Sequence, residues 1–176
     1  AREGPVRDFD QRFTDPPSYI LGITKEIWED RNVERLREYY TADIPVRSPD
    51  GYVLGSEAVI AATHATLEEF PDRQLLGEDV IWSDDGNGGF FSSHRIFSTA
   101  THLGDGAFGE ATGTHLRYRV IADCAARANQ LYDGWLVRDL GAIVRQLGST
   151  PEMFAACQVK TEGNTEQAVL PLMSQL

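Results

Sequence analysis

The sequence predicts an α+β domain built on a curved, mostly antiparallel sheet that helices cover on one side. The prediction rests on a strand-rich stretch in the second half of the chain, where β-branched and aromatic residues are frequent. A tight connection and a flanking helix in the same stretch indicate that these strands are neighbours. The three long strands are expected over Ser92–His102, Thr114–Cys124 and Gln130–Arg138, with Ala125–Asn129 joining the last two.

The first half of the chain supplies helices and shorter strands. Apolar residues recur there at helical spacing, and Pro-Asp-Gly and Gly-rich stretches mark turns. Ser56 is expected to cap a helix that ends at Pro71, because proline cannot continue a helix. Helices are expected over Ser18–Asp30, Val33–Tyr40 and from Ser56 to Phe70, and strands over Asp43–Ser48, Tyr52–Leu54 and Gln74–Ser83.

The chain divides into three expected segments. Residues 1–14 are charged and contain proline, so we expect an N-terminal arm outside the core. Residues 15–148 form the domain, which closes with Asp139 as the N-cap of a helix over Leu140–Leu147. Residues 149–176 form a C-terminal extension, with short helices expected over Met153–Cys157 and Ala168–Leu172 and a polar loop between them.

Composition excludes several classes of function. The chain has 176 residues and a net charge of −11, which disfavours nucleic acids and anionic membranes as partners. No apolar run is long enough to span a membrane, and the first residues lack a signal-peptide pattern. Two cysteines are too few for a disulfide framework. We therefore expect a cytoplasmic protein with free thiols.

Cofactor motifs are also missing from the sequence. The four histidines show no metal-ligand spacing, so no metal site is predicted. Gly104, Gly106 and Gly109 match the dinucleotide pattern G-x-G-x-x-G, but they join strand to strand where that motif must open a helix. We expect neither a metal nor an organic cofactor.

Four short motifs carry a resemblance to a known family: His-Leu-Gly at 102–104, Ala-Thr-Gly at 111–113, Trp135 with Asp139 four residues on, and Arg-Gln-Leu-Gly at 145–148. They resemble the SnoaL-like polyketide (ester) cyclases of the nuclear-transport-factor-2-like superfamily, over roughly residues 15–148. The resemblance implies a cone-shaped, cystatin-like fold with helices over the concave face of the sheet and a small-molecule cavity between them. It implies little about the reaction, because this superfamily carries many chemistries on one cavity.

The acid/base residues implied by the family are missing. Its catalytic aspartate matches Leu136, and its cavity histidine matches Ala122. By elimination, His102 is predicted to be the acid/base group, assisted by His94 or by the Tyr118 hydroxyl, because imidazole titrates near neutral pH. The alternative for His102 is a structural role, in which it holds the Gly104–Gly109 loop by a hydrogen bond.

Strand alternation, with the cavity face that the resemblance implies, selects most of the residues expected to bind substrate, and Trp28 and Tyr40 come from the helices above that face. His94 and Ser98 share one face, and Tyr118 and Tyr132 share the cavity face with Ala122 and Leu136. If Arg95 lies inside, it would neutralise an anionic substrate, and otherwise it forms a surface ion pair. The expected substrate-binding residues are Trp28, Tyr40, Arg95, Ser98, Ala122, Tyr132 and Leu136.

Two classes of function remain open. The first is a cofactor-independent acid/base enzyme (cyclase, isomerase, dehydratase or hydrolase) acting on a small apolar or polyketide-like molecule. The alternative is a non-catalytic binding module or a dimerising accessory protein on the same fold. Three or more converging polar groups with shifted pKa favour the enzyme, and a smooth apolar wall favours the binder. Trp135 and Ile121, beside Arg117 and Arg119 on the outer sheet face, predict a homodimer.

Overall fold

The computed structural model describes residues 6–163 of the chain. These residues form two units that meet in sequence between Asp139 and Leu140, and each unit is described by itself. The first unit contains the sheet and the helices of the N-terminal half. The second contains two helices.

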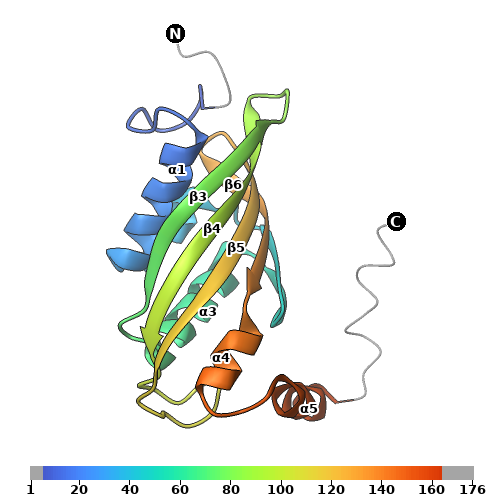
Figure 1. Cartoon of the computed structure of the whole chain (residues 1–176). Coiled ribbons are helices and arrows are strands. Elements are labelled where there is room, and N and C mark those ends of the chain that lie inside the picture. The colour runs from blue at the N-terminus through green and yellow to red at the C-terminus, as the bar shows by residue number, and fades with distance from the viewer. Residues whose placement is uncertain (1–5, 164–176) are drawn as a thin grey trace. The chain divides into compact units, whose positions relative to one another are not determined.

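A six-stranded sheet forms the framework of the first unit, and its long strands curve strongly (Figure 1). The strand order is β2-β1-β6-β5-β4-β3. Every neighbouring pair is antiparallel except β1 and β6, which are parallel. The expected α+β class with a curved, mostly antiparallel sheet is therefore confirmed. The strands are β1 Pro45–Ser48, β2 Gly51–Leu54, β3 Gln74–Asp84, β4 Gly89–Thr101, β5 His115–Arg127 and β6 Gln130–Arg138.

The helices of the first unit lie behind the sheet in Figure 1, on its inner face. Asp15 caps the first helix by accepting a hydrogen bond from the Ser18 amide, and Pro16 occupies the first turn, where its missing N–H costs nothing. Ser56 was expected to be a cap, but it is the first helical residue and Gly55 is the cap, without a side-chain hydrogen bond. The elements are α1 Pro16–Thr24, the π-helical η1 Lys25–Glu29, the 3₁₀ η2 Val33–Arg35, α2 Leu36–Tyr39 and α3 Ser56–Glu69.

The hairpin between β5 and β6 is tighter than the sequence indicated. Strand β5 continues to Arg127, and only Ala128 and Asn129 form the turn, with φ angles of 48° and 66°. Two positive φ angles are typical of the type I′ turn that joins twisted antiparallel strands. The Tyr19 hydroxyl donates to the Asn129 carbonyl at 2.9 Å, which ties this turn to α1.

A bulge interrupts β6 just after this turn. Asp133 pairs with Ala125 and Leu131 pairs with Ala126, so Tyr132 has no partner on β5. The extra residue reverses the alternation of faces before it. Leu131 therefore shares the inner face with Leu136, and Tyr132 does not.

The described part of the N-terminal segment belongs to the core. Val6, Phe9 and Phe13 are buried, and the Phe9 ring packs edge-on against Tyr19 at 4.7 Å between centroids. Phe9 also contacts Phe90 of β4. The expectation that this segment lies outside the core is wrong for these residues, because three apolar side chains spaced along it reach the aromatic cluster under α1.

The second unit contains α4 Leu140–Gln146 and α5 Pro151–Glu162. The Thr150 hydroxyl caps α5 by accepting from the Met153 amide at 3.2 Å. Helix α5 is longer than the helix expected over Met153–Cys157. It includes Lys160, which was expected to lie in the polar loop. The helix expected over Ala168–Leu172 lies outside the described residues. Among residues 6–163, no helix has the length and apolar character needed to cross a bilayer.

Candidate functional site

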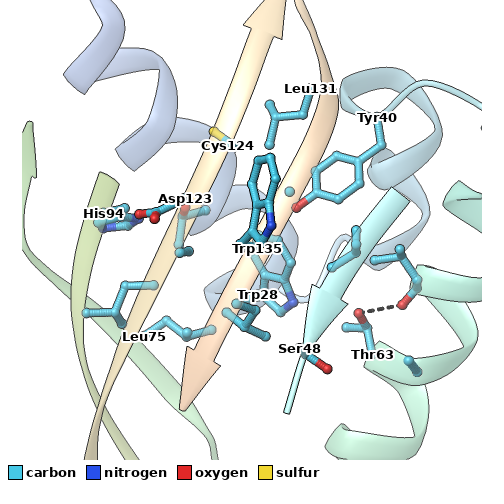
Figure 2. A pocket seen from close by; sticks show the side chains of 18 of the residues that line it. Trp28, Tyr40, Ser48, Thr63, Leu75, His94, Asp123, Cys124, Leu131 and Trp135 are labelled. Carbon is cyan, nitrogen blue, oxygen red and sulfur yellow. Dashed lines mark hydrogen bonds between the residues drawn. The ribbon is translucent and has the colours of Figure 1, made fainter. Parts of the chain in front are cut away.

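A cavity of about 210 Å³ lies within the first unit, between the inner face of the sheet and the helices α1, η1 and α3 (Figure 2). Most of its wall is aliphatic or aromatic. Such a wall suits a largely apolar small molecule. Its apolar lining includes Ile20, Ile23, Ile44, Val46, Leu75 and Ile96.

Five of the residues predicted from the sequence line this cavity. His94, Ala122 and Leu136 form one cross-strand row, because His94 pairs with Ala122 and Ala122 with Leu136. Trp28 follows from η1 and Tyr40 from the end of α2, and Figure 2 shows them on different sides of the cavity from His94. Strand alternation thus predicted that these three positions share the face that lines the cavity.

His94 is the histidine of the cavity wall. Its side chain is 2% exposed, and its Nε2 has no hydrogen-bond partner within residues 6–163. Burial lowers the pKa of His94 to about 4, because the charged form loses its hydration. The imidazole is therefore neutral at pH 7, with a ring nitrogen that the described protein atoms do not use.

His102 lies outside the cavity, contrary to the prediction that it is the acid/base group. Its Nε2 is 3.2 Å from Glu69 Oε1 and its Nδ1 is 3.1 Å from Thr112 Oγ1. The Glu69 carboxylate also accepts hydrogen bonds from the Ala107 and Phe108 amides, at 3.1 and 2.9 Å. Both nitrogens of His102 are thus occupied in holding the Gly-rich loop, which supports the structural alternative.

Ser98 and Tyr118 face inward from β4 and β5 but do not line the cavity. Ser98 is fully buried, and its hydroxyl donates to the Gln74 carbonyl at 2.8 Å. Tyr118 is its cross-strand partner and lies beside Arg73. Neither residue is part of the cavity wall, so a direct contact of either hydroxyl with a ligand is not supported.

Arg95 and Tyr132 also lie away from the cavity. Glu78 is the extra residue of a bulge in β3, and it binds Arg95 at 3.1 Å and Arg119 at 2.9 Å. Arg95 therefore forms the surface ion pair that was the alternative to an inward position. The bulge in β6 displaces Tyr132, whose ring lies 5.5 Å from the Arg127 guanidinium.

Two residues that line the cavity, Arg73 and Arg138, were not predicted from the sequence. Each has a buried Nε without a hydrogen-bond partner among the described residues, and Arg138 also binds Asp50 at 2.9 Å. Burial lowers the pKa of Arg73, and the charges of Arg138 and Arg31 add to the effect, while Tyr118 opposes it. Arg138 could have been predicted from the sequence, because strand alternation places it on the same inner face as Leu136. Arg73 precedes β3 in a turn, where no periodicity places it.

Cys124 and Tyr40 add two further polar groups to the wall. Burial raises the pKa of Cys124 to about 11, and burial together with Cys124 raises the pKa of Tyr40. The Cys124 Sγ lies 3.1 Å from the Ser92 hydroxyl. Both groups therefore stay protonated at pH 7.

Within residues 6–163, no three His, Cys, Asp or Glu side chains gather in a way that could hold a metal ion.

Comparison with known proteins finds its matches among solved structures. No family model and no curated protein matches the sequence. IdmH from Streptomyces antibioticus, assigned as a polyketide cyclase, is 20% identical, with a TM-score of 0.65 over 77% of this chain and 99% of its own. AclR from Streptomyces galilaeus, assigned as a hydroxylase, is 21% identical, with a TM-score of 0.65 over 77% and 96%. A protein from Jannaschia sp. CCS1 assigned as a SnoaL-like polyketide cyclase is 18% identical, with a TM-score of 0.67 over 79% and 99%.

Proposed function

We propose that this chain, which has the fold of the SnoaL-like polyketide cyclases, transfers protons on a small, largely apolar molecule bound in its cavity, with His94 as the acid/base group. The observation that carries the proposal is the buried imidazole in the cavity wall, whose Nε2 has no partner within the described residues. A polar group that is buried without a hydrogen bond costs free energy. Because Nε2 is buried beside Gly77 of β3, a ligand that bonds to it would have to displace its neighbours, and the bond would then remove that cost.

The protonation state of His94 fits the start of such a reaction. Its pKa of about 4 keeps the imidazole neutral at pH 7, so it is ready to accept a proton. Negative charge that develops on a substrate nearby favours the imidazolium as it forms. An apolar cavity strengthens this attraction, because little water is present to screen it.

The composition of the cavity wall supports an enzyme over a binding module. Four polar groups with shifted pKa line it, from His94, Arg73, Cys124 and Tyr40. Active sites are where such groups concentrate, although structural networks also contain them. The assignments of IdmH and the Jannaschia protein as polyketide cyclases support a polyketide-like substrate.

A binding module without catalysis is the second candidate. It is favoured by Leu136 and Ala122, which are apolar at the two positions where the related cyclases are expected to carry acid/base residues. The two candidates differ in what happens to a bound molecule that has an acidic C–H bond. The enzyme accelerates loss of that proton, and the binding module does not.

The test uses 5-nitrobenzisoxazole, a small aromatic probe for proton abstraction from carbon. A base takes the C3 proton, the N–O bond breaks, and the product is the coloured 2-cyano-4-nitrophenolate. We expect the wild-type protein to accelerate the reaction, and His94→Gln to reduce the acceleration by about 10²–10⁴-fold. His64→Gln is the matched control, because His64 is exposed on α3 beside Glu34, and it should keep the wild-type rate.

Two results would contradict the proposal. A folded His94→Gln protein with the wild-type rate would remove His94 from the chemistry. A wild-type protein that binds the probe without accelerating its reaction would favour the binding module.

A further inference from the structure

Two arginines bring positive charge into a cavity that is otherwise mostly apolar. Arg73 is 7% exposed, and the Arg138 side chain is 18% exposed. Both line the cavity, and the Nε of each is buried without a partner among residues 6–163. The protein as a whole carries a net charge of −11, so this positive end is a local feature of the cavity.

The charges at this end do not balance within the described residues. Arg138 pairs with Asp50, but no carboxylate within residues 6–163 forms an ion pair with Arg73. Arg138 and Arg31 repel Arg73, while Arg73 donates a hydrogen bond to the neutral Tyr118 hydroxyl, which brings no full negative charge. The three arginines at this end share one acidic ion-pair partner among the described residues, Asp50, so positive charge is in excess there.

Such an arrangement costs free energy unless an anion compensates it. Moving a cation out of water costs several kcal/mol unless an anion or several hydrogen bonds replace the lost hydration. A guanidinium presents a planar set of N–H donors that matches the two oxygens of a carboxylate. An incoming carboxylate would supply both the missing charge and an acceptor for the free donors.

We propose that the cavity takes a ligand with an apolar body and a single carboxylate, and that Arg73 and Arg138 hold the carboxylate. The inference rests on the proposed function only in taking the cavity as the ligand site. It adds the chemical class of the ligand.

The sheet register places the carboxylate site relative to His94. His94, Ala122 and Leu136 form one row, and Ile96, Val120 and Arg138 form the row two residues further along the strands. Two residues of a strand span about 7 Å. The ligand would therefore reach from its carboxylate at the arginines to its reacting atom near His94 across a short apolar body.

The test compares two probes that share one ring system. 2-Naphthoate carries a carboxylate, and 2-naphthamide is its neutral counterpart of nearly equal size. Calorimetric titration of the wild-type protein should show that 2-naphthoate binds at least tenfold more tightly. Equal affinities, or no saturable binding of 2-naphthoate, would overturn the inference.

Variants locate the site. Arg73→Met should abolish the preference for 2-naphthoate and leave binding of 2-naphthamide intact. Arg119→Met is the control and should keep the preference, because Arg119 pairs with Glu78 on the outer face. Arg73→Met should also raise the melting temperature, because an unpaired buried charge is removed. Ala122→Phe, which places a ring in the cavity, should abolish binding of both probes. A preference that survives Arg73→Met, or 2-naphthoate binding that survives Ala122→Phe, would overturn the inference.

The same titrations separate this inference from the proposed function. His94→Gln should keep the preference for 2-naphthoate while it loses the acceleration of 5-nitrobenzisoxazole. If the preference is found and the acceleration is not, the carboxylate site stands and the protein is a binding module. If the acceleration depends on His94 but the two naphthalene probes bind equally, the proton transfer stands and the carboxylate site is wrong.

Discussion

Glu69 Oε1 lies 3.2 Å from His102 Nε2, and the two side chains are 5% and 0% exposed. Glu69 closes α3 and His102 follows β4, so their contact joins the helix to the sheet. The same carboxylate holds the amides of Ala107 and Phe108 in the loop between β4 and β5. These contacts explain why His102 is buried, and they require no catalytic role for it.

Removing the Glu69 carboxylate should destabilise the fold. Glu69→Ala leaves His102 and two loop amides without their acceptor, and we expect the free energy of unfolding to fall by about 3 kcal/mol. Glu68→Ala, at the exposed neighbouring position, should change it by less than about 0.5 kcal/mol. Urea unfolding measures both. Equal stability of the two variants would show that the Glu69 cluster contributes nothing to the fold.

Stability should depend on pH through His94. Its pKa is about 4 in the folded protein, below the ordinary value of 6.5, so between these values the unfolded chain binds the extra proton. The wild-type protein should therefore lose about 2 kcal/mol between pH 7 and pH 5 through this residue. His94→Gln lacks that loss and retains the contributions of all other groups. The difference between the two proteins in urea unfolding at both pH values isolates the effect, and identical pH dependence would contradict the lowered pKa.

Gly77 lies so close to His94 that a methyl group added at position 77 would crowd the imidazole. A Cβ at position 77 would lie 2.9 Å from His94 Nε2 and 2.4 Å from Leu21 Cδ2. Gly77→Ala should therefore lower the free energy of unfolding by about 1–3 kcal/mol through overpacking. Gly134→Ala is the matched control, because its Cβ would meet no atom closer than 3.6 Å. Thermal unfolding that ranks Gly134→Ala as the more damaging change would contradict this packing.

The outer face of the sheet exposes large apolar side chains that a second copy of the chain could cover. Phe91 is 50% exposed and Val137 59%, and Trp135, which is also among the residues that line the cavity, is 42% exposed. We expect a homodimer through this face at micromolar concentration, and Val137→Glu should dissociate it because it would bury an unpaired charge. Val159→Glu, at an exposed position on α5, is the control. Sedimentation that finds only monomers of the wild-type protein would contradict the prediction.

The regular parts of the sheet were predictable from the sequence. Alternation along β4, β5 and β6 places His94, Ala122 and Leu136 on one face, and these strands pair without a shift at that row. The resemblance to SnoaL-like cyclases indicated which face encloses the cavity and suggested Trp28 and Tyr40 from the helices above it.

The errors have local physical causes. The bulge in β6 turned Tyr132 away from the cavity, and no residue type marks that bulge in the sequence. The His102 prediction followed from elimination among histidines. That reasoning could not include Glu69, because a partner 33 residues away in sequence is visible only in the folded chain. Arg73 was missed for the same reason, since a turn residue reaches the cavity through tertiary packing alone.

The pH dependence of the reaction of 5-nitrobenzisoxazole tests the central claim most directly. The relevant quantity is the part of the rate that is lost in His94→Gln, measured from pH 8 to pH 5. Because His94 has a pKa of about 4, it remains a free base over this whole range, and that rate should change by less than about twofold. A decline centred near pH 6.5, where an exposed histidine titrates, or a rate equal to that of His94→Gln, would contradict the account.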